Sequence, residues 1–172
     1  MASLDTFESV RTVLAVRQFR PDPIRDEVVR QIVESAHLTA SASNAQPWHF
    51  IVVQNIETLQ QLGQLARTGP YIAQAPLAIV VVIDRTPLSV SDGSRAIQSM
   101  MLTAWSQGVA SNWVGFVGGV DAVKPLLGIP DEKDVLAIVP FGYSIKPVGA
   151  GKKKRKPLGE VVSLERFGQP YH

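Results

Sequence analysis

The segment Leu77–Ile83 reads Leu-Ala-Ile-Val-Val-Val-Ile, an unbroken apolar run in which β-branched residues dominate. Such side chains favour a strand, and a strand without polar alternation is typical of one that is covered on both faces. The run therefore predicts a central strand with helices on both sides of its sheet, an α+β arrangement.

Apolar spacing and turn residues predict the other elements. Ser91 or Asp92 is expected to cap a long helix that ends near Gly108. No G-x-G-x-x-G follows a strand, which argues against a Rossmann nucleotide fold. The expected helices cover 4–15, 24–38, 57–66, about 92–108 and 121–127, and the expected strands cover 48–54, 77–83, 109–116 and 135–141.

Length and composition narrow the class of protein. A chain of 172 residues is most simply one domain, 1–172. It has no cysteine, which excludes disulfides and thiolate chemistry. No apolar run approaches the roughly 20 residues of a membrane span, and Met1 to Arg11 does not resemble a secretory signal. We therefore expect a cytoplasmic protein that uses no membrane.

The net charge of +2 conceals a local asymmetry. Five basic residues run from Lys152 to Lys156, so the remaining 12 basic and 15 acidic residues sum to −3. A nucleic-acid binder spreads its cations over a face and interleaves aromatic residues, whereas here the aromatic residues lie elsewhere. No nucleic-acid partner is expected. The basic tail, about 149–172, serves one small anion or is simply solvated.

Residues for hydrolytic or metal chemistry are scarce. His37, His49 and His172 share no metal-ligand spacing, no pair of carboxylates stands out, and no G-x-S-x-G elbow occurs. No metal site and no catalytic side chain is predicted. An enzyme this poor in acids and bases relies on a cofactor for its reaction.

One turn is unusually rich in polar side chains. Ser41-Ala42-Ser43-Asn44-Ala45-Gln46-Pro47-Trp48 lies between a helical pattern and an apolar strand. A simple connection would use Gly, Asp and Asn without a bulky aromatic residue. Ser41 and Asn44 either contact a ligand or cap the helix end and organise the turn, a role that suits both residue types.

The pattern Ser41-x-x-Asn44-x-Gln46-Pro47-Trp48 resembles the signature of the nitroreductase family of FMN-dependent oxidoreductases. Further matches follow in the expected order over about residues 4–167. They are Val16–Phe19, Ala75-Pro76, Gly108–Gly115, Leu127–Pro130, Phe141-Gly142-Tyr143 and Arg155–Val162.

This resemblance implies a nitroreductase-like α+β fold: a central, mainly antiparallel sheet of four to five strands, flanked by helices, with a C-terminal arm that reaches the partner subunit. It implies a homodimer with FMN at the subunit interface. NADH or NADPH would pass hydride to FMN and leave, and a nitroaromatic, a quinone or an activated alkene would then be reduced.

The resemblance also implies the residues that bind the flavin. Arg17 would contact the electron-rich edge of the ring, and Ser41 and Asn44 would contact the flavin from the neighbouring subunit. A backbone N–H at Val114-Gly115 would face the reactive ring nitrogen, where glycine permits close approach. Lys153 and Arg155, two residues apart before Pro157-Leu158, would hold the phosphate.

The sequence departs from the family upstream of Arg17. Members commonly read Arg-Arg-Ser-Val-Arg-x-Phe, whose first Arg and Ser contact phosphate, whereas this chain has Val13-Leu14-Ala15-Val16-Arg17-Gln18-Phe19. Whether Arg11 replaces them stays open. Two alternatives follow: another reaction on the same scaffold, such as alkene reduction, dehalogenation or flavin fragmentation, or a flavin-binding protein without turnover.

Overall fold

The computed structural model describes residues 5–146 and 153–171, so Lys152, His172 and the start of the predicted basic tail lie outside the described residues. Four strands form one sheet in the order β1-β2-β4-β3, and every strand pair is antiparallel. In chain order the elements are α1 (Thr6–Thr12), α2 (Asp26–His37), the 3-10 turn η1 (Ala42–Asn44), β1 (Trp48–Val53), α3 (Ile56–Leu65), η2 (Pro70–Gln74), β2 (Leu77–Ile83), α4 (Ser89–Ser106), β3 (Ala110–Ser111), η3 (Asp121–Val123), α5 (Lys124–Leu127), β4 (Asp134–Gly142) and η4 (Leu158–Glu160).

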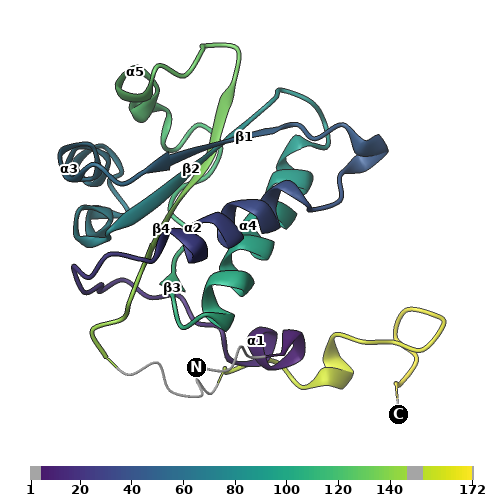
Figure 1. Ribbon diagram of the computed structural model, residues 1–172. Coiled ribbons are helices and arrows are strands. Elements are labelled where there is room, and N and C mark those ends of the chain that lie inside the picture. The colour runs from purple at the N-terminus through teal and green to yellow at the C-terminus, as the bar shows by residue number, and fades with distance from the viewer. Residues whose placement is uncertain (1–4, 147–152, 172) are drawn as a thin grey trace.

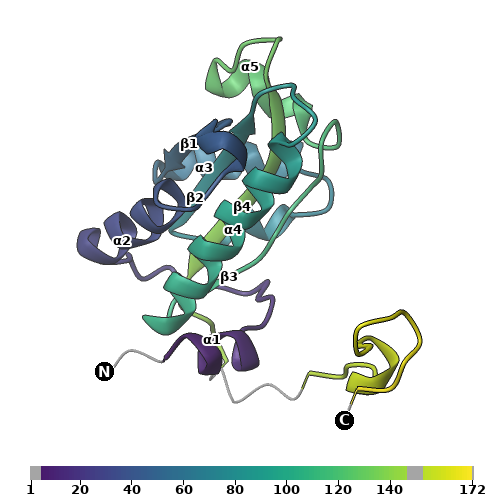
Figure 2. The same ribbon diagram turned by 90° about the vertical axis from the view of Figure 1, so that its right-hand side faces the viewer.

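The central strand is covered on both faces, as the apolar run predicts. Every residue of β2 is buried, and alternate side chains enter two different clusters. Leu77, Ile79, Val81 and Ile83 pack with α2 and α4. The intervening side chains pack with α3 and with the segment before β4. Figures 1 and 2 show α2 and α4 on one face of the sheet and α3 on the other, which confirms the predicted α+β fold.

The N-terminus of α4 differs from the prediction. The helix begins at Ser89, with Leu88 at the cap position and no side-chain cap. Asp92 therefore lies inside the first turn, where its N–H already donates to the Leu88 carbonyl at 2.9 Å. The prediction that Ser91 or Asp92 caps this helix is wrong because the helix starts earlier. Asp92 is completely buried and makes other contacts.

The strand predicted over 109–116 is much shorter. Only Ala110–Ser111 pairs continuously with β4, and a single further bridge joins Val114 to Ile138. The next residue in register, Asn112, donates to the carbonyl of Pro140 at 3.3 Å. Proline has no N–H to return that bond, so the ladder stops there.

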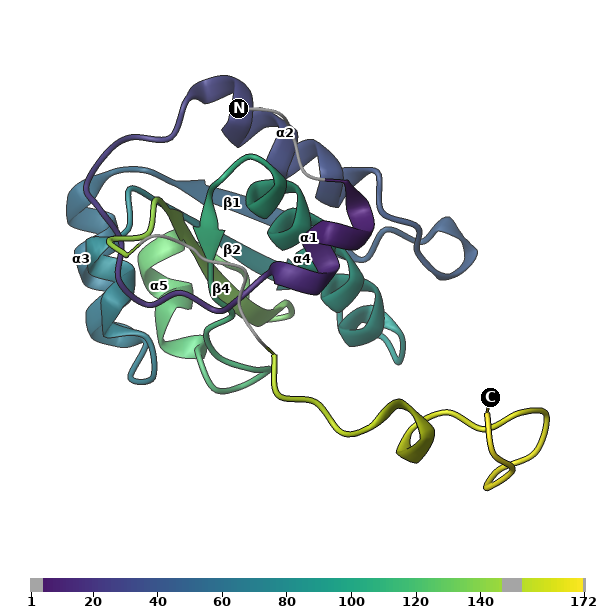
Figure 3. The ribbon, with the colours of Figure 1, turned by 90° about the horizontal axis from the view of Figure 1, so that it is seen from below.

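The C-terminal segment 153–171 extends away from the sheet past α1, as Figures 1 and 3 show. Within the described residues, one hydrogen bond ties it to the rest of the chain, from Lys153 Nζ to the carbonyl oxygen of Val10 at 2.6 Å. The segment exposes several large apolar side chains, and Phe167 is fully exposed. Leu158, Val161 and Leu164 are 62%, 62% and 48% exposed.

Candidate functional site

The segment 15–19, which contains Arg17, is joined to the edge of the sheet by two backbone bridges. A parallel bridge joins Ala15 to Ser111 of β3, and an antiparallel bridge joins Phe19 to Ser144. Arg17 lies between these two fixed points, and its side chain is exposed. The backbone position of Arg17 is therefore fixed by the sheet while its guanidinium group faces solvent.

Lys153 and Arg155 lie near the same end of the molecule. Lys153 Nζ donates to the carbonyl of Val10 in α1. Burial and the neighbouring charge of Arg155 lower the pKa of Lys153 below its ordinary value. Among the ion pairs of the described residues, none includes Arg17, Lys153 or Arg155. These three cations are thus available to an anionic ligand.

Arg11 does not replace the missing phosphate contacts in this structure. Its guanidinium donates to both carboxylate oxygens of Glu8, at 2.8 Å and 2.5 Å. This hydrogen-bonded pair lowers the pKa of Glu8 and raises that of Arg11. The positive charge of Arg11 is therefore neutralised within α1.

Val114 and Gly115 follow β3, and only the N–H of Val114 is already hydrogen-bonded within the described residues. The N–H of Val114 is bonded to the carbonyl of Ile138 at 3.0 Å, and the Val114 side chain is buried. Gly115 has φ 89°, and a Cβ there would lie 2.4 Å from a methyl carbon of Val120. Within the described chain, no hydrogen bond uses the Gly115 N–H. The amide donor predicted at Val114-Gly115 is accordingly the one of Gly115.

The polar turn after α2 is held in a strained conformation. Ser43, Asn44 and Gln46 have φ values of 51°, 55° and 48°, in the left-handed region that non-glycine residues rarely adopt. The hydroxyl oxygen of Ser41 accepts a hydrogen bond from the N–H of Gln46 at 2.9 Å and closes the turn. Ser41 therefore has the organising role that the sequence left open. Ser41 is half-buried, and the Asn44 side chain is exposed.

The predicted flavin residues do not converge within one chain. The turn contacts the first turn of α4 through the bond from Ala42 N–H to Asp92 Oδ2, at 3.2 Å. The other end of α4 contacts α1 through the bond from Trp105 Nε1 to Thr12 Oγ1, at 2.9 Å. At about 1.5 Å per helical residue, Asp92 and Trp105 are roughly 20 Å apart. Figure 1 shows the turn and α1 on opposite sides of α4.

We name the two groups accordingly. The turn half-site consists of Ser41–Gln46. The basic half-site consists of Arg17, Val114, Gly115, Lys153 and Arg155, which lie by α1, by β3 or on the segment after β3.

The basic half-site fits a phosphorylated, planar cofactor such as FMN. Its cations have no carboxylate partner among the described residues, so a phosphate would neutralise them. The side chain of Val120 fills the space beside Gly115, while no hydrogen bond among the described residues uses the Gly115 N–H, so this amide could donate to a ring. The buried Ser111 Oγ also lacks a hydrogen-bond partner in the described part of the chain. The donor chemistry is therefore that of an anion-and-ring site.

Sequence reasoning missed two contacts near these half-sites. Asp92 was considered only as a helix cap, yet its carboxylate contacts the polar turn. The side chain of Asn112, which is almost fully buried, hydrogen-bonds the hydroxyl of Tyr71 in η2. Asn112 lies inside the Gly108–Gly115 motif, and this position is the only sequence feature that points to its hydrogen bond with Tyr71.

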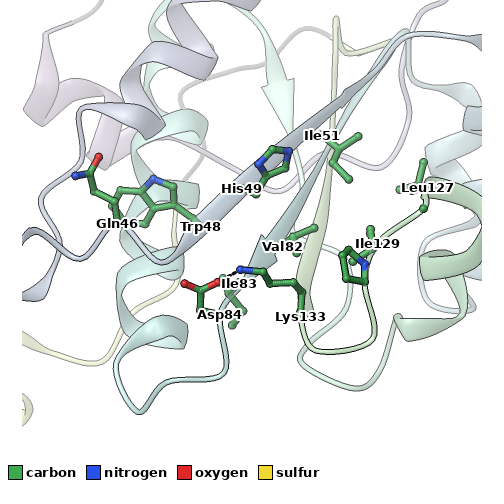
Figure 4. Close-up of a pocket in the computed structure, with 12 residues that line it drawn as sticks. Gln46, Trp48, His49, Ile51, Val82, Ile83, Asp84, Leu127, Ile129 and Lys133 are labelled. Atoms are coloured by element: carbon green, nitrogen blue, oxygen red, sulfur yellow. Dashed lines mark hydrogen bonds and ion pairs between the residues drawn. The ribbon is translucent and has the colours of Figure 1, made fainter.

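A separate cavity of about 600 Å³ lies beside β1 and contains none of the predicted flavin residues. Its walls are largely apolar, with the ion pair between Asp84 and Lys133 at its rim (Figure 4). Gln46 lines the same cavity, next to the strained turn. The cavity has a size typical of small-molecule sites but lacks the unpaired cations of the basic half-site.

Metal-binding clusters and membrane-spanning helices are absent from the described residues. In residues 5–146 and 153–171, no cluster of three or more His, Asp or Glu side chains is arranged to hold a metal ion. Across the same described ranges, no helix has the length and apolar character needed to cross a membrane.

Solved structures share this fold. An FMN-dependent nitroreductase from Clostridium difficile R20291 superposes with a TM-score of 0.83 and is 24% identical, covering 94% of this chain and 99% of that protein. The fold class is therefore that of the nitroreductases, as predicted.

Sequence comparison extends this result from fold to family. The nitroreductase family model matches residues 11–89 and 73–143. A putative NADH dehydrogenase/NAD(P)H nitroreductase of Archaeoglobus fulgidus is 33% identical over 81% of this chain and 85% of the relative. A protein of the same description from Methanothermobacter thermautotrophicus is 29% identical over 87% and 82%. The chain belongs to the nitroreductase family.

The chain is also similar to proteins that are named as deiodinases. An iodotyrosine deiodinase of Hydra vulgaris is 24% identical over 93% of this chain and 72% of the relative.

Proposed function

We propose that this chain is an NAD(P)H-dependent FMN oxidoreductase that acts as a homodimer and reduces a small acceptor such as a nitroaromatic or a quinone. The observation that carries the proposal is the pair of half-sites at opposite ends of α4 in a member of the nitroreductase family. One half-site supplies cations and an amide, and the other supplies a rigid polar turn.

A two-fold dimer would complete the site. In such an interface each chain presents the same surface to the other, so the turn half-site of one subunit can meet the basic half-site of its partner. Two equivalent FMN sites result. The exposed apolar side chains of residues 158–167 support an arm that packs on the partner subunit.

The residues of the basic half-site have distinct tasks in this proposal. Lys153 and Arg155 hold the FMN phosphate through charge-assisted hydrogen bonds. Arg17 lies at the ring edge, where its charge stabilises negative charge on the reduced ring. The N–H of Gly115 donates toward the reactive ring nitrogen. FMN, when bound, supplies the two-electron chemistry that these side chains lack.

In this proposal the reaction would follow a ping-pong order, in which NADH or NADPH would donate hydride and leave before the acceptor binds. The protein contributes orientation and charge. The scheme requires no side-chain acid or base, in keeping with the scarcity of such groups in the sequence.

The first experiment is to purify the protein, record its visible absorption spectrum and identify any flavin released on denaturation. We expect a yellow protein that releases FMN, loses its absorbance rapidly on anaerobic mixing with NADH or NADPH, and recovers it with a nitroaromatic or a quinone. A colourless protein that also fails to take up added FMN contradicts the proposal.

Reductive removal of iodide from iodotyrosine is the second candidate, because iodotyrosine deiodinases are among the relatives. The same reduced protein distinguishes the two activities. Iodide release from added iodotyrosine with little nitroaromatic reduction would favour deiodination.

A further inference from the structure

Asp92 is a buried carboxylate that the proposed reaction does not use. Its side chain is 1% exposed, in the first turn of α4. One oxygen pairs with the guanidinium of Arg95, and the other accepts the N–H of Ala42. Burying a carboxylate is costly, although the helix N-terminus offsets part of this cost.

The part of α4 that carries Asp92 is rigidly seated on the sheet. A Cβ at the adjacent Gly93 would lie 2.7 Å from a methyl carbon of Leu136 and 3.0 Å from one of Ile83. Ala96 and Ile97, one turn further on, are completely buried. Asp92 is therefore a fixed point, because this turn of the helix cannot move without displacing the core.

The turn that Asp92 contacts is closed by its own hydrogen bonds and tied at its flanks, from Thr39 Oγ1 to Ser99 Oγ at 2.8 Å and from the Asp84 N–H to the Pro47 carbonyl at 3.1 Å. Ser43 to Gln46 are exposed, and three of these residues have positive φ. Each such conformation costs on the order of 1 kcal/mol and persists only when its surroundings enforce it. Among the described residues, the bond from Ala42 to Asp92 is the hydrogen bond that ties Ser41–Gln46 to α4.

We infer that Asp92 is a positioning residue for the cofactor site: it fixes the turn half-site so that Ser41 and Asn44 are presented to the FMN of the partner subunit. This inference rests on the proposed function and adds a residue to it. Asp92 does not contact FMN itself, and it acts through Ala42.

Three variants test the inference by FMN affinity, measured by fluorescence titration of the dimer. Asp92→Ala removes both contacts and should weaken FMN binding about tenfold or more, as for a lost hydrogen bond to a charged group. Asp92→Asn keeps an acceptor oxygen for Ala42 and should recover a large part of this loss. Arg95→Ala leaves the Ala42 bond in place and should weaken binding less than about threefold.

Ala42→Pro removes the same bond from the side of the turn. The substitution deletes the N–H donor, and proline is well tolerated at the first position of a helical turn. Ser41, which precedes it, is already extended at φ −126° and ψ 158°, as a residue before proline must be. The ring carbon Cδ takes the place of the proton that faced Asp92 Oδ2, so we expect a lower thermal stability as well as FMN binding weakened about tenfold or more. Asp92→Asn, which keeps the shape of the side chain, stays informative if the other two variants fail to fold.

Asp84→Ala is the matched control for loss of an aspartate. It breaks the ion pair with Lys133 at the cavity beside β1, which Gln46 also lines, but among the described residues its carboxylate makes no hydrogen bond to Ser41–Gln46. FMN affinity should stay within about twofold of the unsubstituted protein, because an exposed pair contributes little.

Heterodimers show whether Asp92 affects the FMN site of the partner subunit. A merely structural role of Asp92 would not confine its effect to that site. With Asp92→Ala in one chain and Arg155→Ala in the other, one of the two sites receives both changes and the other keeps native affinity. With both changes in one chain and an unsubstituted partner, each site receives one change, so neither is native.

The outcomes separate the inference from the function on which it rests. An unsubstituted protein that binds no FMN contradicts the proposed function. A protein that binds FMN equally well with and without Asp92→Ala and Ala42→Pro overturns the inference alone. The opposite heterodimer pattern also overturns the inference. If a native-affinity site appears when both changes are in one chain, and none appears when each chain carries one change, the turn acts within its own subunit.

Discussion

The two half-sites are built on opposite physical principles. The turn half-site carries no net charge, and its conformation is strained and internally hydrogen-bonded. The basic half-site carries three cations without carboxylate partners among the described residues, on exposed or half-buried side chains. The first is held by its own hydrogen bonds, whereas the cations of the second would be neutralised by the phosphate of the proposed cofactor. Shape in one subunit and charge in the other would together select FMN.

Substitution of Gly115, which is tightly packed against Val120, should have the largest effect on stability and FMN binding. Gly115→Ala places a Cβ 2.4 Å from Val120 at a φ of 89°. We expect the free energy of unfolding to fall by roughly 3 kcal/mol or more and FMN binding to be lost. Chemical denaturation and flavin titration measure the two effects.

Gly118→Ala is the control for this prediction. Gly118 has φ 77°, but nothing lies within 4 Å of the added Cβ, so we expect the cost of the backbone conformation alone, about 1 kcal/mol. Equal losses for the two variants would show that close packing at Gly115 is irrelevant.

The charge-based part of the basic half-site should be sensitive to single cations. Arg155→Ala is expected to weaken FMN binding about tenfold or more through loss of a charge-assisted contact. Lys156→Ala removes the same charge from an exposed neighbour and should change affinity much less, and the same holds for Lys152→Ala. Flavin loss on dialysis measures both. Similar losses would mean that the tail acts only through its total charge.

The lowered pKa of Lys153 predicts how FMN binding depends on pH. The protonated lysine binds phosphate, so affinity should fall as the pH rises through this pKa, and the fall should begin below the ordinary lysine value of 10.5. In Lys153→Arg the cation persists, and we expect affinity at alkaline pH to exceed that of the unsubstituted protein by about threefold. Coincident pH profiles would remove Lys153 from the phosphate site.

The smallest expected effects lie in the turn half-site, where backbone strain and ligand contact can be separated. Asn44→Gly suits the φ of 55° and should leave the free energy of unfolding within about 0.5 kcal/mol. It should nevertheless weaken FMN binding about threefold, through loss of the amide contact.

Ser43→Gly is its matched control. Ser43 is an exposed residue with φ 51° and no predicted contact, so FMN binding should be unchanged. If both variants bind FMN normally, Asn44 serves the turn and not the cofactor.

Much of the fold could be predicted because its signals are local. The unbroken run of β2 predicted a strand covered on both faces, and apolar spacing predicted a long helix over about 92–108, most of which is α4. Errors arose where partners distant in sequence decide the outcome. Strand β3 is short because Pro140 lies opposite Asn112, and the start of α4 could not be located from possible caps alone.

The candidate site divides in the same way. The sequence by itself determined the family, the central strand and which residues carry charge or amides, because these follow from residue type and short-range spacing. Only the tertiary structure decided that the predicted flavin residues fall at opposite ends of α4, that Arg11 is neutralised by Glu8, and that Asp92 supports the turn. The physical reason is that burial and pairing of charges depend on which segments the fold brings together.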